Sequence, residues 1–302
     1  MKTLLVPVDY SEASLKALET ALNLASRIHA KLLLCHVYQT PVYAAEVHHP
    51  VYALPLYETK QDALAKLRKF VKRVKNDPEV DVPVAYTVVV GSVVEGLLEL
   101  AQKRKASLII IGTTGRGSLE NKLFGSTTKH LVKHASCPVL AVPQKARLSP
   151  VNRVVYASAL EPGEAGALVQ LSQLRHLFSS ALTLLYVDCG DKQSQVNIDI
   201  RKNELLKDLP DDTYTFSQVR CDKVAEGIVH FVQAYNADLL AFTVSRRGFW
   251  KNMMQSSTTS RLLEELNLPM LAFPQYPAPA TGFMPDEQDE EHAAMQEKPV
   301  KP

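Results

Sequence analysis

Two glycine clusters in the first half of the chain have the residue types and spacing of a phosphate-binding loop. Gly112 follows an apolar run, Gly115 comes three residues later, and Gly125 stands directly before Ser126 and Thr127. Glycine lets backbone N–H groups approach a ligand without interference from a Cβ atom. A Gly-Ser-Thr sequence at the start of a helix adds N–H and hydroxyl donors at the positive end of the helix dipole. These residues predict a site for a phosphorylated ligand.

Two familiar phosphate motifs do not fit these residues. A P-loop needs a lysine before its hydroxyl residue, and the span from Gly112 to Ser118 has none. A dinucleotide fingerprint needs G-x-G-x-x-G at the start of a helix, whereas Gly112, Gly115 and Gly117 give G-x-x-G-x-G. One alternative stays open, in which the glycines only form turns and hold no ligand.

The length and composition of the chain indicate two domains. With 302 residues, of which 46% are hydrophobic, it has enough apolar material for two cores. The net charge is +2; residues 275–302 hold six acids and two lysines, a net −4, which leaves +6 on residues 1–274. We see in this mild excess no concentrated basic stripe of the kind that nucleic-acid binding requires, and we predict no nucleic-acid partner.

The cysteines and the N-terminal residues indicate the compartment. The four cysteines have no spacing typical of a metal site or a disulfide framework, and we interpret them as reduced core residues. The chain starts with a strand-like run rather than a signal peptide, and no apolar run approaches the ~20 residues that span a bilayer. We expect a cytoplasmic protein with no membrane partner.

Strand-length apolar runs alternate with helical patterns through the first half. Continuous apolar runs such as 108–111 are typical of a parallel sheet that is covered on both faces. The pattern predicts a doubly wound α/β domain with a five-stranded parallel sheet. Strands are expected near 2–8, 31–38, 83–90, 107–112 and 138–142, and helices near 11–29, 58–76, 92–105 and 126–135.

The second half of the chain repeats the first. The run at 154–158 matches 4–8 at an offset of 150, and the run at 237–242 matches 106–111 at an offset of 131. A repeat of this length indicates two whole domains rather than a small repeated unit. The predicted domains are 1–143 and 152–274, with a linker at 144–151 and a disordered acidic tail at 275–302.

The change of offset, 19 residues, places an insertion in the first copy within 39–58. This insertion follows the second strand at the carboxyl edge of the sheet, where ligands bind in such folds. Two interpretations stay open: a flap over the bound ligand, or an aromatic loop packed on a partner. His48 and His49 are adjacent on this loop, which is not a metal-ligand pattern, and we predict no metal site.

Three loci together resemble the nucleotide-binding signature of the universal stress protein family. They are the glycine spacing Gly112-x2-Gly115-x9-Gly125-Ser126, the pair Val8-Asp9 after the first strand, and the pair His36-Val37 at the end of the second. The resemblance extends over residues 1 to about 143. It implies two tandem Rossmann-like domains of the adenine nucleotide alpha hydrolase kind.

The resemblance implies a role for each matching residue. Pro7, Asp9 and Val37 would frame the adenine and the ribose. The phosphates would be held by Gly112, Gly115, Gly125, Ser126 and Thr127. Thr113 and Arg116 of the same loop are added to the predicted site, and for Arg116 two states stay open, a bidentate pair with a terminal phosphate or an exposed, solvated side chain. For Asp9 a second role stays open, as the N-cap of the first helix.

The second copy departs from this pattern at each key position. Ala159 replaces Asp9, Thr243 replaces Gly112, Arg246 replaces Gly115 and Ser256 replaces Gly125. β-Branched Thr243 resists the positive φ that glycine tolerates, and Arg246 would enter the path of the phosphates. We predict one nucleotide per chain, in the first domain, and a degenerate second domain that is a scaffold or a regulator.

The resemblance implies an ATP-binding stress-response or signalling module with an unidentified protein partner. Two alternatives stay open, a slow ATPase or ATP-dependent transferase and a structural pseudo-dimer without ligand. No catalytic residue is assigned, because the glycine loop offers no base or metal-holding acid beyond Glu120, so binding without efficient turnover is favoured. ADP or AMP could replace ATP, with or without Mg²⁺.

The resemblance also implies an association between domains. Family members commonly pair through their last strands, so the two halves are expected to form an internal pseudo-dimer around 139–142 and 270–273. Assembly into a homodimer stays open.

Overall fold

The computed structural model describes residues 2–38, 59–78, 80–113, 125–146, 151–178, 180–190, 195–207, 209, 214–244 and 266–274. The predicted insertion at 39–58, most of the glycine loop (114–124) and the predicted tail at 275–302 lie outside these residues. So does 245–265, which includes Arg246 and Ser256 of the second copy.

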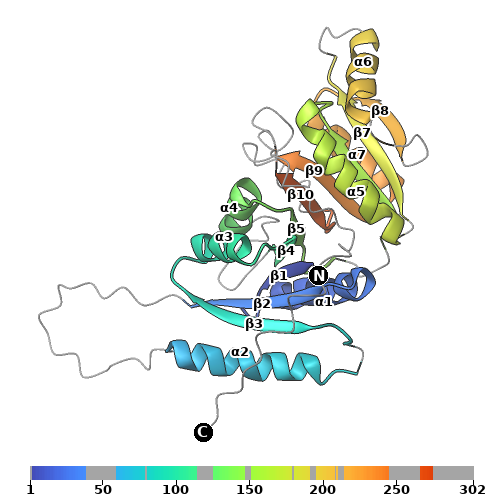
Figure 1. The fold of residues 1–302 in the computed structure, drawn as a ribbon. Helices are drawn as coiled ribbons and strands as arrows, with labels where there is room; N and C mark the ends of the chain where they lie inside the picture. Colours follow the sequence, from blue (N-terminus) through green and yellow to red (C-terminus); the bar gives the residue numbers. More distant parts are fainter. Residues whose placement is uncertain are drawn as a thin grey trace, which may run out of the picture.

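The described strands form one continuous sheet that contains both halves of the chain (Figure 1). Its order is β3-β2-β1-β4-β5-β10-β9-β6-β7-β8, so the second half mirrors the first about the β5–β10 pair. Neighbours within each half are parallel. The strands are β1 Thr3–Pro7, β2 Lys31–Tyr38, β3 Val84–Val90, β4 Leu108–Gly112, β5 Val139–Val142, β6 Arg153–Ser158, β7 Ala181–Asp188, β8 Thr215–Arg220, β9 Leu239–Val244 and β10 Met270–Pro274.

Helices cover both faces of this sheet. One face carries α1 Glu12–Ile28, α2 Lys60–Lys75, α5 Ala165–Phe178 and α6 Gln195–Leu206; the other carries α3 Val93–Lys103, α4 Ser126–His134 and α7 Val224–Tyr235. Alternate residues of β4 enter the two cores, Leu108 and Ile110 on the first face and Ile109 and Ile111 on the second. This two-sided burial explains the unbroken apolar run, and it confirms the predicted doubly wound α/β class.

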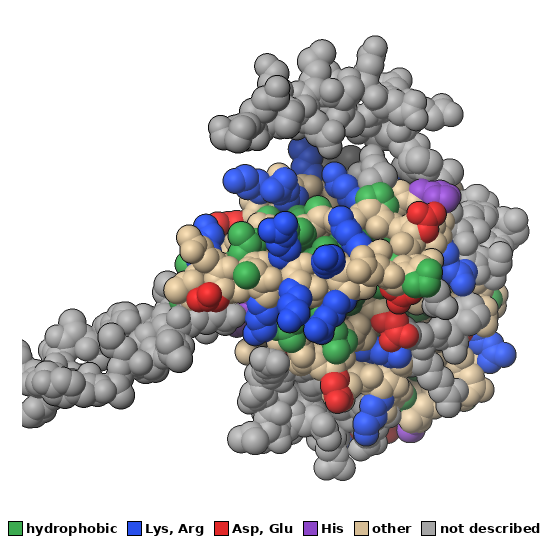
Figure 2. All heavy atoms as spheres, turned by 90° about the horizontal axis from the view of Figure 1, so that it is seen from below, with side chains coloured by type: hydrophobic (Ala, Val, Ile, Leu, Met, Phe, Trp, Pro, Cys, Tyr) green, Lys and Arg blue, Asp and Glu red, His purple; other side chains and the backbone are tan. Residues whose placement is uncertain are grey.

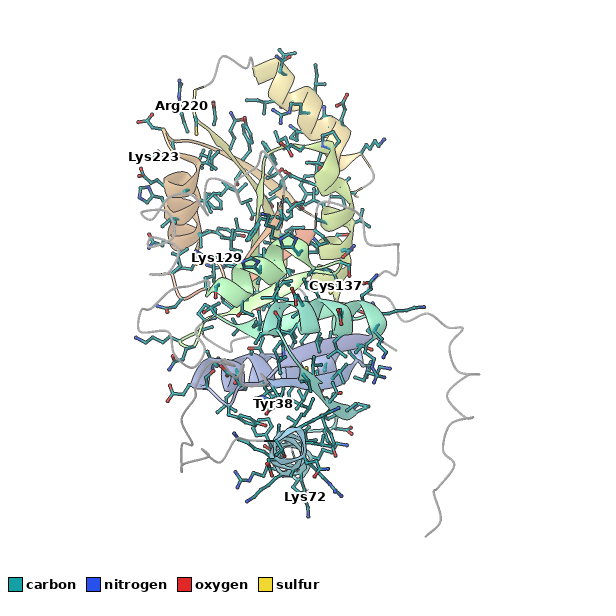
Figure 3. All side chains as sticks on the ribbon, turned by 90° about the vertical axis from the view of Figure 1, so that its left-hand side faces the viewer. Tyr38, Lys72, Lys129, Cys137, Arg220 and Lys223 are labelled. Atoms are coloured by element: carbon teal, nitrogen blue, oxygen red, sulfur yellow. The ribbon has the colours of Figure 1, made fainter. Side chains whose placement is uncertain are left out.

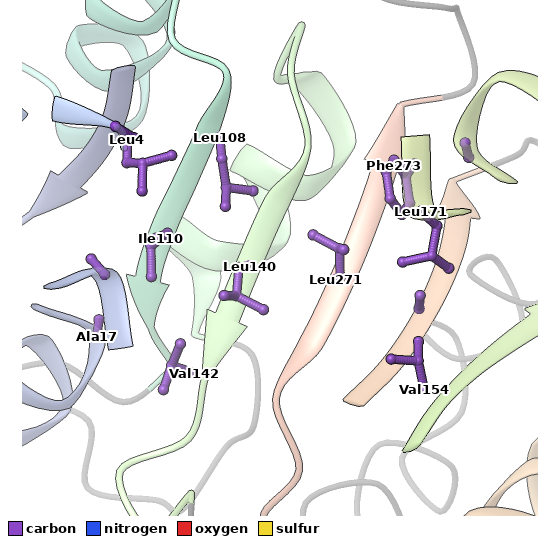
Figure 4. Close-up of a cluster of buried hydrophobic side chains, with 14 of the residues drawn as sticks. Leu4, Ala17, Leu108, Ile110, Leu140, Val142, Val154, Leu171, Leu271 and Phe273 are labelled. Carbon is purple, nitrogen blue, oxygen red and sulfur yellow. The ribbon is translucent and has the colours of Figure 1, made fainter. Parts of the chain in front are cut away.

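The two halves join through their last strands. Leu271 of β10 pairs with Leu140 of β5 in an antiparallel register. Both leucines belong to the hydrophobic cluster on the first face, which runs from Leu4 across the junction to Val154 (Figure 4). The expected pairing around 139–142 and 270–273 is therefore present within the chain.

Backbone conformations repeat at the two offsets found in the sequence. Tyr10 has a φ of 65° and Leu160, 150 positions later, has a φ of 54°. Lys105 and Asn236, which are 131 positions apart, have φ values of 47° and 51°. Left-handed conformations are uncommon for residues other than glycine. Their recurrence at equivalent positions supports the internal repeat independently of side-chain similarity.

The sequence expectation that the chain has no concentrated basic stripe is wrong. Lysines and arginines gather on the outer side of α2, where Figure 2 shows a basic face with few acids between them. Lys72 points away from the sheet on this side (Figure 3). The exposed cations of the helix are Lys60, Lys66, Arg68, Lys69, Lys72, Arg73 and Lys75, and its one acid is Asp62. The net charge of the chain conceals this face, because it averages over the whole sequence.

Candidate functional site

The first half presents its strand ends at one edge of the sheet. β1 lies between β2 and β4, and all three strands are parallel. The chain leaves β1 toward β2 on one side and later returns to β4 on the other, so the switch point lies between β1 and β4. Ligands of open α/β sheets bind at such points. Pro7, Val37 and Gly112 lie at or next to the ends of these strands.

The segment after β1 is held by local hydrogen bonds. The N–H of Val8 donates to the carbonyl of Cys35 at 2.7 Å, and Nδ1 of His36 lies 2.6 Å from the carbonyl oxygen of Val8. The Asp9 carboxylate accepts bonds from the N–H of Ser11, at 2.9 Å, and from its hydroxyl. Asp9 is half-buried, so its carboxylate is fixed at the carboxyl edge of the sheet.

The N-cap of α1 is Ser11 and not Asp9. The hydroxyl of Ser11 accepts a bond from the N–H of Ser14 at 3.2 Å, which is the usual N-cap geometry. The alternative that Asp9 is the N-cap of the first helix is therefore wrong. Asp9 instead orients the capping serine, and this leaves its carboxylate outside the first turn of the helix.

Tyr10 is a neighbour of the site that sequence reasoning did not identify. Its ring lies 5.1 Å from the ring of His36 and 5.5 Å from that of Phe70, and Nζ of Lys66 lies 4.6 Å from its centroid. These contacts on α2 and β2, together with a φ of 65°, fix the turn that follows Asp9. A residue other than glycine with a positive φ cannot be identified reliably from the sequence.

Gly112 has a role in packing, whereas the sequence predicted a role in phosphate binding. A Cβ atom at Gly112 would lie 2.5 Å from the backbone carbon and oxygen of Ala13, at the start of α1. Among the described glycines only Gly91 and Gly190 have a positive φ. The argument that Thr243 resists a positive φ required at this position is therefore wrong. The glycine is needed because α1 passes over the end of β4.

The chain leaves the sheet edge after Thr113 and returns beside it at Gly125. Thr113 is buried and its N–H donates to the carbonyl of Val142 at 3.1 Å. The N–H of Gly125 donates to the carbonyl of Thr113 at 3.1 Å, which closes the loop. Gly115 and Arg116, two of the predicted site residues, fall in the stretch 114–124 outside the described residues.

The start of α4 lacks the groups that usually satisfy a helix N-terminus. Its N-cap is Gly125, no side chain caps it, and its first turn contains no acid. Ser126 is exposed and Thr127 is half-exposed. The first N–H groups of a helix have no partner within the helix and carry a partial positive charge. This end of α4, anchored to β4 through Thr113, is suited to an anion.

In the second half, buried polar side chains lie at the end of β9, the place that corresponds to the end of β4 in the first half. The hydroxyl of Tyr156 on β6 lies 2.7 Å from the hydroxyl oxygen of Thr243, and both residues are buried. Burial, together with nearby Glu164, raises the pKa of Tyr156 well above its ordinary value. Tyr156 and Thr243 are the counterparts of Val6 and Gly112 in the first half.

Glu164 and Arg201 fix the segment that follows β6. The Glu164 carboxylate accepts bonds from the N–H of Ala159, at 2.9 Å, and from the hydroxyl of Ser158. The guanidinium of Arg201 donates to the carbonyls of Ala159 and of Leu160, the latter at 3.2 Å. Burial raises the pKa of Glu164 from its ordinary 4.5 to about 7. Polar groups of the protein itself thus bond to this segment.

The fold defines the class of protein as a Rossmann-like α/β protein with two similar halves. A sequence model of the Universal stress protein family matches residues 1–143. A universal stress protein of Methanocaldococcus jannaschii is 33% identical over 144 residues, which are 47% of this chain and 81% of that protein. One from Thermus aquaticus is 30% identical over 142 residues, covering 47% of this chain and 98% of its own.

A solved structure extends the similarity to both halves. The crystal structure of a universal stress protein from Archaeoglobus fulgidus covers 90% of this chain and 96% of its own, with a TM-score of 0.68 and 15% identity. This likeness concerns the fold. The sequence relatives show that the chain belongs to the universal stress protein family.

None of the helices in the described ranges is both long and apolar enough to cross a bilayer.

Proposed function

We propose that the first half binds one adenine nucleotide and that the protein is an ATP-binding module of a stress-response or signalling system. One observation carries the proposal. The start of α4, which has neither a side-chain cap nor an acid, is hydrogen-bonded through Gly125 to the end of β4 beside the switch point. This is where a doubly wound sheet binds ligands and where a helix dipole favours phosphate.

The positions of the described residues of the predicted site support one orientation of the nucleotide. Pro7, Asp9 and Val37 lie at the ends of β1 and β2 and would receive the adenine and the ribose. The N–H groups of the first turn of α4, with the hydroxyls of Ser126 and Thr127, would receive the phosphates. Gly115 and Arg116 would complete this phosphate end.

We further propose that the second half leaves its equivalent corner without a nucleotide. The carboxylate of Glu164 and the guanidinium of Arg201 bond to the backbone of Ala159, which stands at the place of Asp9. Thr243 brings a side chain to the place of Gly112 and bonds with Tyr156. A nucleotide there would have to displace these bonds, so we expect a stoichiometry of one.

Calorimetric titration of the full chain with ATP, ADP and AMP, each with and without Mg²⁺, tests these proposals. We expect one bound nucleotide and a loss of at least about tenfold in affinity, or about 1.4 kcal/mol, in Asp9→Ala. Asp188→Ala is the matched control, because it removes a carboxylate from the carboxyl edge of the second half. The control should bind as the unmodified chain does.

Three results would count against these proposals. A chain that binds none of the three nucleotides would overturn the proposed function. Two nucleotides per chain would overturn the account of the second half, and equal losses in the two variants would remove Asp9 from the site. A turnover assay on the same samples separates a binding module, which releases ATP unchanged, from a slow ATPase.

A further inference from the structure

Two cysteines stand side by side at the carboxyl edge of the second half. β7 and β8 pair Asp188 with Arg220, and the N–H of Cys221 donates to the carbonyl of Asp188 at 3.0 Å, which continues the parallel ladder. The next residues in register are therefore Cys189 and Cys221. Neighbouring strands lie about 4.8 Å apart, and residues in register point to the same face. Both cysteines pack against the hydrophobic cluster on the second face.

This spacing falls within the range of a disulfide. Cα atoms of bonded cysteines lie about 4.4–6.8 Å apart, which includes the spacing of adjacent strands. Gly190 follows Cys189 with a φ of 77°, and its N–H donates to the carboxylate of Asp188, so the strand ends in a turn at this position.

The four cysteines differ in their access to solvent. Cys35 and Cys137 are buried, and burial raises the pKa of each thiol to about 12, which makes them poor nucleophiles at neutral pH. Cys189 and Cys221 are half-exposed, so the sequence prediction that all four are core residues is wrong for this pair. Arg220 and Lys223, which flank Cys221 in the sequence, are labelled in Figure 3. In the first half Gly91 takes the ladder position of Cys221, because it follows the Tyr38–Val90 pair and its N–H donates to the carbonyl of Tyr38 at 3.0 Å. Gln39 stands after Tyr38, where Cys189 stands after Asp188.

We propose that Cys189 and Cys221 are a redox modification site that forms a reversible disulfide. The co-reactant is a small-molecule disulfide of the glutathione type. One protein thiolate attacks it, forms a mixed disulfide and releases one thiol; the second protein thiolate then attacks the protein sulfur of that bond and releases the other thiol. The protein loses two electrons and two protons, and the reagent is reduced to two thiols.

The test uses the full chain incubated with oxidised glutathione, followed by alkylation of remaining thiols and peptide mass spectrometry. We expect a peptide pair joined through Cys189 and Cys221, lighter by two hydrogens than the separate peptides, and reversal by dithiothreitol. Cys189→Ser and Cys221→Ser should each carry one glutathione, on the cysteine of the pair that remains. Cys35 and Cys137 should be alkylated only after unfolding, and they serve as internal controls.

Two outcomes would overturn the proposal. One is glutathione on both Cys189 and Cys221 of the same molecule without a joined pair. The other is that both thiols stay reduced after incubation with excess oxidised glutathione. Circular dichroism of the serine variants before oxidation confirms that each is folded, so a missing product is then attributable to the chemistry of the pair.

Discussion

At the scale of single residues, a missing side chain has two very different explanations. Gly112 has the spacing of a phosphate-binding glycine, but the space that its Cβ would fill is occupied by the backbone of Ala13. Gly125 is less constrained, because a Cβ there would lie 3.3 Å from the carbonyl oxygen of Thr113. Stability and binding, measured separately, distinguish the packing role of a glycine from a role at the ligand.

Gly112→Ala should therefore destabilise the protein even without ligand. Overpacking of this kind typically costs about 1–3 kcal/mol, because α1 would have to move away from β4. Gly125→Ala is the control and should cost less. Urea unfolding of both variants and the unmodified chain measures the difference. Equal free energies of unfolding in the two variants would contradict the packing role of Gly112.

Glu164 should make the second half sensitive to pH. Its folded pKa, about 7, is above its ordinary value of 4.5, so between these values the folded state holds a proton that the unfolded state has lost. Stability is then fullest below pH 4.5 and falls as pH rises to 7, by up to about 3 kcal/mol at 1.36 kcal/mol per pKa unit. Glu164→Gln should lack this decline. Parallel stability curves for the two proteins between pH 4.5 and 7 would refute the assignment.

At the scale of elements, the start of α4 combines a weak cap with a position next to the switch point. α1 and α2 begin with side-chain caps, Ser11 and Thr59, the latter in a capping box with Asp62. α4 begins with Gly125 and no such bond. A helix start without a side-chain cap is less stable, and its first N–H groups are left available to bind a ligand.

Ser126→Asp should have opposite effects on stability and on binding. An acid in the first turn interacts favourably with the helix dipole and should stabilise the free protein by about 0.3–1 kcal/mol. The same charge should repel phosphate and weaken nucleotide binding. Thermal unfolding and calorimetric titration measure the two effects, with Ser126→Asn as the neutral control. A variant that is more stable and binds ATP unchanged would place the phosphates elsewhere.

At the scale of the whole molecule, the antiparallel β5–β10 pair makes one sheet of two repeated halves. Leu140 and Leu271 are buried there, and the first-face cluster continues through them. The side chains that stabilise one half at this junction thus also stabilise the other. We expect the halves to unfold together rather than in sequence.

Leu271→Ala should weaken this coupling. Removal of a buried leucine side chain typically costs about 2–5 kcal/mol through lost burial and a residual cavity. Scanning calorimetry should show one transition in the unmodified chain, and a lower or divided one in the variant. Leu64→Ala is the control, because Leu64 is an exposed leucine on α2 and its loss should change little. Two transitions in the unmodified chain would contradict the coupling.

The sequence predicted the regular elements well and the local details less well. Every strand and helix expected in the first half is present, with ends within two residues of the prediction. Apolar periodicity determines these elements, because it reflects which faces must be buried. Sequence reasoning did not find Ser11 as the cap, the left-handed Tyr10 or the Tyr156–Thr243 bond. These depend on neighbours that compete for the same hydrogen bonds or come together only after folding.

The amino-acid order by itself determined a repeated α/β protein with a glycine-rich loop after the fourth strand of its first copy. Those features are local, since runs, periods and offsets can be counted along the chain. Only the tertiary structure decided that Gly112 contacts Ala13, that Arg201 bonds to the backbone of Ala159, and that α2 presents one basic face. Each of these depends on residues distant in sequence or on the orientation of a helix, and packing alone sets both.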